Sequence, residues 1–277
     1  MFDEKFRVCY ADTSAGVALH QRIRYQVFCR DKGFEDPDAF PRAEEADAFD
    51  DQSVHFVVQD KRTGRWVAAT RLVLPKRNRL LPVDALSAFD RRRVPEPTAQ
   101  IGEVSRFCVM NSLPSATELA TNLADWPART SLELGNVVSS ERLEVILGML
   151  RATSIFALKR RMEWFVVFIN HAFARILRGL GIVMRQVGPV VEHRGLRTAY
   201  LINARESILS VSQKSTNMRE FFRRSRLAYV RISLVADNPH VECVSEFATG
   251  HALFEESIFR ESSFRDLNAG PRVAAAG

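Results

Sequence analysis

A helical pattern that runs almost directly into a short apolar strand limits the fold of this chain more than any other feature. Apolar residues keep helical spacing over residues 143–158, and the opposite face of this segment carries basic residues. The longest fully apolar run, the six residues Trp164–Ile169, follows. A membrane-spanning helix needs roughly 20 apolar residues, so the run predicts a buried strand instead. A core helix beside a buried strand indicates an α/β sheet.

The same patterns predict the remaining elements of a mixed central sheet flanked by helices. A strand over 5–10 precedes a helix that begins near Thr13 or Ser14. A β-hairpin follows over 54–74, because two apolar runs flank a turn that contains glycine. The later elements are expected to be a short helix over 84–92, a strand over 101–110, a helix over 171–180 and strands over 182–187 and 198–203.

Composition excludes several classes of protein. The chain is 46% hydrophobic and 26% charged, which is typical of a globular protein, and 277 residues can bury a sizeable core. The four cysteines stand far apart, so we predict neither a metal site nor a disulfide framework, and a cytoplasmic location is expected. The patterns divide the chain into a domain over 1–205 and a mostly helical appendage over 206–277.

Charge is distributed unevenly along the chain. Residues 31–60 hold ten Asp/Glu against two Lys/Arg, whereas residues 151–185 hold seven Lys/Arg against Glu163 alone. The acidic segment suits a cationic small molecule and the basic segment suits an acidic partner, with two solvated faces as the alternative. Nucleic-acid binding is not expected, because aromatic residues do not alternate with the basic ones and no DNA or RNA motif is present.

Four short motifs combine ionisable and apolar residues. They are Arg22-Ile-Arg24-Tyr-Gln-Val-Phe28, Glu45-Ala-Asp47-Ala-Phe-Asp50, Thr70-Arg71-Leu-Val-Leu-Pro75 and Glu103-Val-Ser105-Arg106-Phe107. Strand alternation places Glu103, Ser105 and Phe107 on one face and Arg106 on the other. A strand that only packs rarely mixes residues in this way, so we predict a site there, with a buried Glu103–Arg71 ion pair as the alternative.

The order and spacing of these motifs resemble the acyl-homoserine-lactone (autoinducer) synthase branch of the GNAT-like acyltransferases. A fifth motif, Gly188 to Tyr200, is more similar to the PEP-CTERM/exosortase-associated acyltransferases and the related N-acyl amino acid synthases. The resemblance covers about residues 5–204. It implies a GNAT-like α/β fold and an enzyme that transfers an acyl group from a thioester to an amine.

Such a reaction needs a neutral amine and donors for the developing oxyanion. Glu103 is the candidate base that takes the amine proton. The resemblance implies that backbone amides near Phe107 and Cys108 bind the thioester carbonyl and pantetheine. The Cys108 thiol itself is not expected to be a nucleophile, because a lone cysteine on a strand is usually a core residue. His55 is likewise expected in the core.

The acceptor is expected in a polar cage of Arg24, Asp47, Asp50 and Arg71. Local surface pairs for the aspartates and a solvated position for Arg24 are the alternatives. The remaining predicted substrate-binding residues are Phe28, Phe34, Ser105 and Arg106. Phe34 stands where the lactone synthases usually carry a tryptophan that encloses S-adenosylmethionine, which favours an amino acid as the acceptor. A lactone synthase and a non-enzymatic acyl-binding regulator are the alternative functions.

The donor is expected to be a long-chain acyl-phosphopantetheine on acyl carrier protein, with no bound cofactor. Residues 108–120 contain no glycine, so the turn that cradles the pyrophosphate of coenzyme A is not predicted. Basic residues are expected to dock the acidic carrier, with solvated helix faces as the alternative. These are Arg151, Lys159, Arg160, Arg161, Arg175 and Arg178. Any peripheral membrane contact is expected at the basic C-terminal segment.

Overall fold

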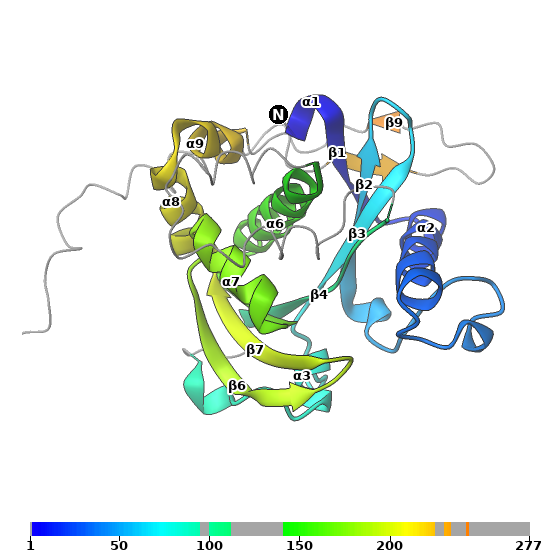
Figure 1. Cartoon of the computed structure of the whole chain (residues 1–277), viewed down its shortest axis with the longest axis horizontal. Helices are drawn as coiled ribbons and strands as arrows, with labels where there is room; N and C mark the ends of the chain where they lie inside the picture. Colours follow the sequence, from blue (N-terminus) through cyan, green and yellow to red (C-terminus); the bar gives the residue numbers. More distant parts are fainter. Residues whose placement is uncertain (1, 95–99, 112–140, 225–229, 234–241, 244–277) are drawn as a thin grey trace, which may run out of the picture.

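A mixed β-sheet forms the centre of the molecule (Figure 1). The computed structural model describes residues 2–94, 100–111, 141–224, 230–233 and 242–243. Within these residues the sheet has nine strands in the order β6-β7-β5-β4-β3-β2-β1-β8-β9. The strands are β1 Phe6–Ala11, β2 Ser53–Asp60, β3 Trp66–Val73, β4 Ile101–Val109, β5 Trp164–Ile169, β6 Met184–Glu192, β7 Leu196–Asn203, β8 Val230–Ser233 and β9 Glu242–Cys243.

Strand pairing is mostly antiparallel. Only β4 with β5, and β1 with β8, run parallel. The predicted hairpin over 54–74 is confirmed as β2 and β3. The two last predicted strands of the domain are also a hairpin, β6 and β7, so the Gly188 to Tyr200 motif spans its turn.

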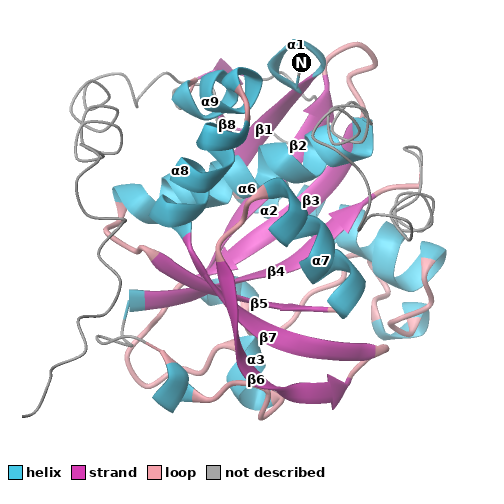
Figure 2. Cartoon of the chain, turned by 60° about the vertical axis from the view of Figure 1, so that its left-hand side comes forward, coloured by secondary structure: helices cyan, strands magenta, loops and turns pink. Residues whose placement is uncertain are grey.

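Helices cover both faces of the sheet (Figure 2). One face carries α6 (Glu141–Lys159), α7 (His171–Leu180), α8 (Ala204–Lys214) and α9 (Thr216–Arg223), and the helix α1 (Phe2–Lys5) packs beside them. The other face carries α2 (Ser14–Tyr25) and α3 (Pro82–Ala85). A π-helical segment, Gln26–Asp31, continues α2. Short 3-10 turns occur at Pro37–Ala39, Asp50–Gln52 and Arg91–Arg93.

Local signals place the ends of two helices as predicted. The Thr13 side chain accepts a hydrogen bond from the Gly16 N–H and caps α2. Asn170 caps α7 in the same way, and Gly181, at φ 101°, ends it. The predicted helix over 84–92 is wrong in extent, because the segment forms the short α3 and a separate 3-10 turn.

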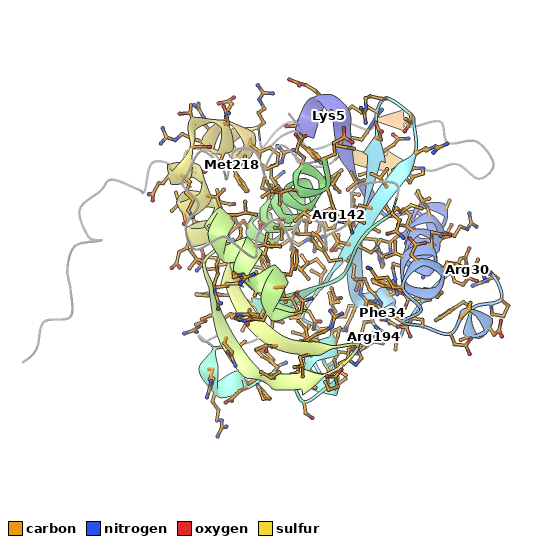
Figure 3. All side chains as sticks on the ribbon, viewed as in Figure 1. Lys5, Arg30, Phe34, Arg142, Arg194 and Met218 are labelled. Carbon is orange, nitrogen blue, oxygen red and sulfur yellow. The ribbon has the colours of Figure 1, made fainter. Side chains whose placement is uncertain are left out.

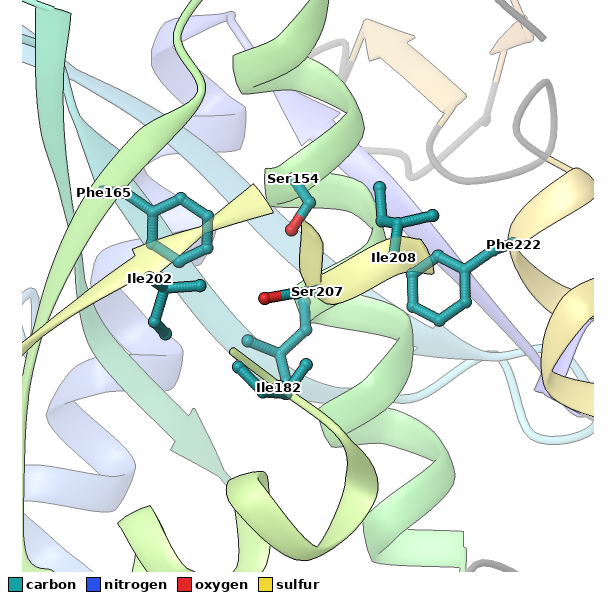
Figure 4. A pocket seen from close by; sticks show the side chains of 8 residues that line it. Ser154, Phe165, Ile182, Ile202, Ser207, Ile208 and Phe222 are labelled. Atoms are coloured by element: carbon teal, nitrogen blue, oxygen red, sulfur yellow. The ribbon is translucent and has the colours of Figure 1, made fainter. Parts of the chain in front are cut away.

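The main core lies between α6 and the sheet. Side chains from β1, β2 and β3 pack against α6, which is buried around most of its circumference. A small cavity lies within this core between α6, β5, β7, α8 and α9, and Figure 4 shows the hydroxyl groups of Ser154 and Ser207 among its lining side chains. None of the helices in the described part of the chain is long and apolar enough to cross a membrane.

The predicted basic outer face of α6 is wrong at Arg151. This side chain is fully buried, with an ion pair of 2.5 Å between its Nη2 and Asp3 Oδ1. Its guanidinium also lies 3.9 Å from the ring centroid of Phe221. Asp3 belongs to α1 and Phe221 to α9, so elements from opposite ends of the described chain cover this face of the helix. Arg151 is therefore not a docking residue.

The segment after residue 205 contains α8, α9 and the strands β8 and β9. Strand β8 pairs with β1, so this segment extends the sheet of the preceding residues. The division of the chain at 205 stays a prediction, and residues 244–277 lie outside the described residues. Residues 112–140 also lie outside the described residues.

Candidate active site

The sheet opens between β4 and β5. These parallel strands pair only from Ile101 to Val104 on β4 and from Trp164 to Val167 on β5. Beyond that point β4 continues beside β3, and Phe168 and Ile169 of β5 pair only with β7. Beyond Val104 and Val167 the two strands are therefore no longer paired, and we call this unpaired part of the sheet the opening.

A bulge in β4 lies at this opening. Arg71 pairs with Ser105 and Ala69 pairs with Cys108, so Arg106 and Phe107 together stand opposite the single residue Thr70. Arg106 has a φ of 50°, which an arginine rarely adopts. A bulge of two residues against one leaves backbone polar groups out of the strand ladder, next to the opening.

The bulge corrects the predicted arrangement of side chains on β4. Glu103 and Ser105 share the face covered by α2 and α3, as expected from strand alternation. Phe107 packs instead into the core on the α6 face, with its ring centroid 6.0 Å from that of Phe173. Arg106 takes the opposite side and bonds to Glu45. The extra residue reverses the alternation after Ser105.

Ion pairs connect α2, the acidic loop and the sheet beside the opening. Arg24 Nε lies 2.5 Å from Glu45 Oε2, and its Nη1 lies 2.6 Å from Asp50 Oδ1. Arg71 binds both oxygens of Asp47, at 2.5 and 2.8 Å, and also reaches Asp50 at 2.6 Å. The predicted cage residues thus lie together. Arg24 is fully buried, so the solvated alternative is wrong for it. Asp47 and Asp50 pair with buried arginines and not only locally, although they also accept hydrogen bonds from the backbone N–H groups of Phe49 and Asp47.

Arg106 joins this cage through two carboxylates. Its Nη2 lies 3.0 Å from Glu45 Oε1 and 2.8 Å from Asp47 Oδ2. Glu45 is 1% exposed and connects Arg24 to Arg106, a role that its sequence position alone did not predict. Its place two residues before Asp47 in the second motif was the available signal. Arg22, in contrast, is an exposed residue that pairs with Glu44 on the surface.

Burial and charge decide which carboxyl groups of the site are ionised. Burial acts to raise the pKa of Asp50, but the charges of Arg24 and Arg71 outweigh it and lower the pKa to about 2. The pKa of Asp47 is also lowered, because the Arg71 and Arg106 charges again outweigh burial. Both aspartates are therefore charged at neutral pH.

Glu103 is the exception. Its side chain is 2% exposed, and burial raises its pKa to about 8 although the Val83 N–H donates to its Oε2 at 2.9 Å. Arg71 gives its hydrogen bonds to Asp47, Asp50 and Ser105, so the alternative of a Glu103–Arg71 ion pair is wrong. The site therefore holds one carboxyl group that can gain or lose a proton near neutral pH.

Two histidines lie beneath the cage. His20 Nε2 lies 3.1 Å from the Thr70 carbonyl oxygen, and His55 Nε2 lies 3.2 Å from that of Asp50. Burial lowers the pKa of His20, and it lowers that of His55 to about 4. The predicted core position of His55 is confirmed. Both rings are therefore neutral near pH 7 and hydrogen-bond to the backbone at or next to the cage residues Asp50 and Arg71.

Aromatic residues and Cys108 complete the surroundings. Arg106 lies over the Phe28 ring, 5.8 Å from its centroid, and the half-buried Phe34 donates its N–H to the Phe28 carbonyl at 2.7 Å. Cys108 is buried on the α2 side, and burial raises the pKa of its thiol to about 12. A neutral, buried thiol is unsuited to nucleophilic attack.

The other predicted docking residues lie away from the cage. Arg160 and Arg161 follow α6, and Arg175 and Arg178 lie on α7; all four are exposed. Lys159 is half-buried, and burial lowers its pKa.

Part of the chain matches a known protein family. Residues 23–119 match the acetyltransferase (GNAT) domain. This segment, about a third of the chain, is similar to a GNAT domain. This match covers the C-terminal end of α2, the acidic loop, the β2–β3 hairpin and β4, which together contribute all the cage residues. It confirms the predicted acyltransferase class. No curated protein sequence matches the chain.

Solved structures confirm the predicted fold for most of the chain. TofI, solved in a ternary complex with an inhibitor and MTA, is similar with 21% identity and a TM-score of 0.53, over 75% of this chain and 96% of TofI. BjaI, a CoA-dependent acyl-homoserine lactone synthase solved with SAM and isopentyl-CoA, has 16% identity and a TM-score of 0.51, over 78% and 89%. MesI, another CoA-dependent synthase of this kind, has 20% identity and a TM-score of 0.50, over 76% and 94%.

Proposed function

We propose that this protein is an N-acyl amino acid synthase, which moves a long-chain fatty acyl group from acyl carrier protein to the α-amine of an amino acid. The observation that carries the proposal is the opening between β4 and β5. There the bulge at Arg106 and Phe107 lies on the same strand as the buried Glu103, whose pKa is near that of an amine. Thioester aminolysis needs backbone N–H groups that bind the carbonyl oxygen and, close to them, a group that accepts the amine proton.

In the proposed reaction the thioester carbonyl lies at the bulge, where backbone N–H groups stabilise the negative oxygen of the tetrahedral intermediate. The neutral amine attacks the carbonyl carbon and forms the C–N bond. The amine proton moves to the carboxylate of Glu103, directly or through water. The C–S bond then breaks, and the sulfur takes up the proton held by Glu103, directly or through water, and leaves as the pantetheine thiol.

The α6 side of the opening suits the acyl chain, and the α2 side suits the amino acid. Phe107 and Phe173 supply an apolar surface on the α6 side, where an acyl chain is excluded from water. The cage lies on the α2 side. Asp47 is the most accessible of its three carboxylates, at 21% side-chain exposure against 10% for Asp50 and 1% for Glu45. We assign Asp47 to the ammonium group of the acceptor.

Asp47→Asn tests this assignment. We expect the acceptor KM to rise about tenfold while the donor KM stays within about twofold, because only the acceptor loses its counter-ion. Steady-state kinetics with each substrate varied in turn gives both constants. Asp51→Asn is the matched control, since Asp51 is exposed and pairs with Arg79 outside the cage. Equal increases in both KM values would contradict the assignment.

A panel experiment identifies the acceptor. Long-chain acyl carrier protein is incubated with each free amino acid and, separately, with S-adenosylmethionine, and the products are measured by mass spectrometry. We expect at least one N-acyl amino acid and no tight binding of S-adenosylmethionine by calorimetry. Micromolar S-adenosylmethionine binding, or lactone and methylthioadenosine among the products, would favour a lactone synthase.

The donor is tested by comparing acyl carrier protein with coenzyme A thioesters of the same chain. We expect kcat/KM to be at least about tenfold higher for the carrier protein and to fall as salt rises, because exposed arginines such as Arg175 and Arg178 attract an acidic partner. Arg175→Glu should lower kcat/KM for the carrier protein alone. Equal efficiency of the two donors without salt dependence would refute the docking proposal.

A further inference from the structure

Arg197 lies on β7, the strand that borders β5 on the side away from β4. It is the second residue of β7, the neighbour of β5 in the sheet. Beyond the separation of β4 and β5, Ala199 pairs with Phe168 and Thr198 with Ile169. Because alternate residues of a strand share a face, Arg197 lies on the same face as Ala199. Ala199 packs with Ile101 and Val166 on the α3 side, which is the face that carries Glu103.

The β6–β7 turn, which directly precedes β7, contacts residues on both sides of the opening. The His193 ring lies 6.1 Å from that of Phe168 on β5, and Arg194 pairs with Glu35, in the loop that follows the π-helix. Glu35 also lies 3.8 Å from Arg106. Figure 3 shows Arg194 beside Phe34, where the hairpin meets this loop. The β6–β7 turn and the cage are therefore two sides of one site.

The arginines of this site differ in their partners. Four of them bind carboxylates: Arg24, Arg71, Arg106 and Arg194. Arg197 has no carboxylate within ion-pair distance among residues 2–94, 100–111 and 141–224. It donates from Nε to the His193 carbonyl at 2.9 Å and from Nη2 to the Arg194 carbonyl at 3.4 Å. A guanidinium has five N–H donors, so others remain for a ligand.

The charge of Arg197 is poorly compensated in its half-buried position. Burial, followed by the charge of Arg194, lowers the pKa of Arg197. An anion bound there would restore the missing interaction. A carboxylate matches the planar, forked guanidinium better than any other common anion of its size.

We propose that Arg197 binds the carboxylate of the acceptor, so that the acceptor lies across the site between Asp47 and the β6–β7 turn. The proposal rests on the proposed function, because it takes an amino acid as the ligand. It explains how the site would select an α-amino acid over a simple amine: the ammonium group interacts with the cage while the carboxylate interacts with Arg197. A phosphate of the pantetheine arm is the other anion that could bind a guanidinium here.

The test compares an accepted amino acid with its amide, which keeps the amine but lacks the carboxylate. We expect the parent enzyme to prefer the acid by at least about tenfold in kcat/KM. Arg197→Gln should lower kcat/KM for the acid by about 10 to 100-fold and leave the amide within about threefold. Arg197→Lys should recover part of the preference, because it keeps the charge but not the fork. Arg185→Gln, which removes an exposed arginine of β6, is the matched control.

Three outcomes would overturn the proposal. An equal loss for acid and amide would show that Arg197 only supports the turn, and melting curves of each variant would detect such a defect. A raised donor KM with an unchanged acid preference would assign Arg197 to the phosphate of the donor. A parent enzyme without preference for the acid would exclude a carboxylate subsite.

Failure of the proposed function would give a different result from failure of the Arg197 proposal. If the parent transfers no acyl group to any amino acid, the function fails before any variant is compared. Calorimetry with S-adenosylmethionine then tests the subsite alone, since this compound also carries an α-amino acid group. Binding by the parent that weakens at least about tenfold in Arg197→Gln would support the subsite, and equal binding or no binding would refute it.

Discussion

Glu103→Gln is expected to fold and to lose acyl transfer by at least about 10²-fold, the range typical for removal of a general base. The amide keeps the size of the side chain and can still accept the hydrogen bond from the Val83 N–H. It has no site for the amine proton. Turnover is measured at pH 7 by release of the pantetheine thiol. Activity within about threefold of the parent would show that Glu103 is not the base.

The pH dependence of the parent provides a second measurement. Burial raises the Glu103 pKa to about 8, so the carboxylate that accepts a proton becomes more abundant as the pH rises toward and through 8. We expect kcat/KM to rise by up to about tenfold per pH unit below 8 and to level off above it. Repeating the pH profile with an acceptor whose amine has a different pKa distinguishes the Glu103 carboxyl from the amine. If the pH at which kcat/KM levels off shifts with the amine pKa, the titrating group is the amine of the acceptor and not Glu103.

Glu163→Gln is the matched control for Glu103→Gln. Glu163→Gln removes a carboxylate at 46% side-chain exposure, just before β5, whose partner is Arg205. We expect its turnover to stay within about twofold of the parent, because surface pairs of this kind contribute little. A comparable loss in both variants would indicate a general effect of charge.

Glu45→Gln is expected to lower the free energy of unfolding by about 3 to 5 kcal/mol, as removal of one partner from a buried ion pair does. Glu45 is 1% exposed and lies between two guanidinium groups, those of Arg24 and Arg106. Burial alone would lower the pKa of Arg24, but Glu45 and Asp50 raise it, so the cation depends on these partners. Denaturant titration measures the loss.

The neighbouring residue offers the control for this prediction. Glu44 pairs with Arg22, whose side chain is 62% exposed. Glu44→Gln is therefore expected to cost no more than about 1 kcal/mol. If both variants lose the same stability, the cage does not depend on Glu45 as a buried ion.

Much of the local structure follows from neighbouring residues alone. The hairpin of β2 and β3 and the helix α7 depend on short patterns and on turn or cap residues within a few positions, such as Asn170 and Gly181. The cage residues were also predicted, because Arg24, Asp47, Asp50 and Arg71 belong to motifs whose order and spacing resemble those of a known family. The exposure of Arg24 was left open, since the charge of an arginine alone does not distinguish a buried ion pair from a solvated side chain.

The sequence by itself determined the periodicities of the helices and strands, and hence the α/β sheet with its acidic loop and basic helices. Tertiary structure alone decided the burial of Arg151, the bulge at Arg106, the role of Glu45 and the unmatched charge of Arg197. Each of these depends on partners that are distant in the sequence or on strand register. Arg151, for example, meets Asp3 across 148 positions of the chain. Periodicity records which side of an element is apolar, but only packing determines what covers that side.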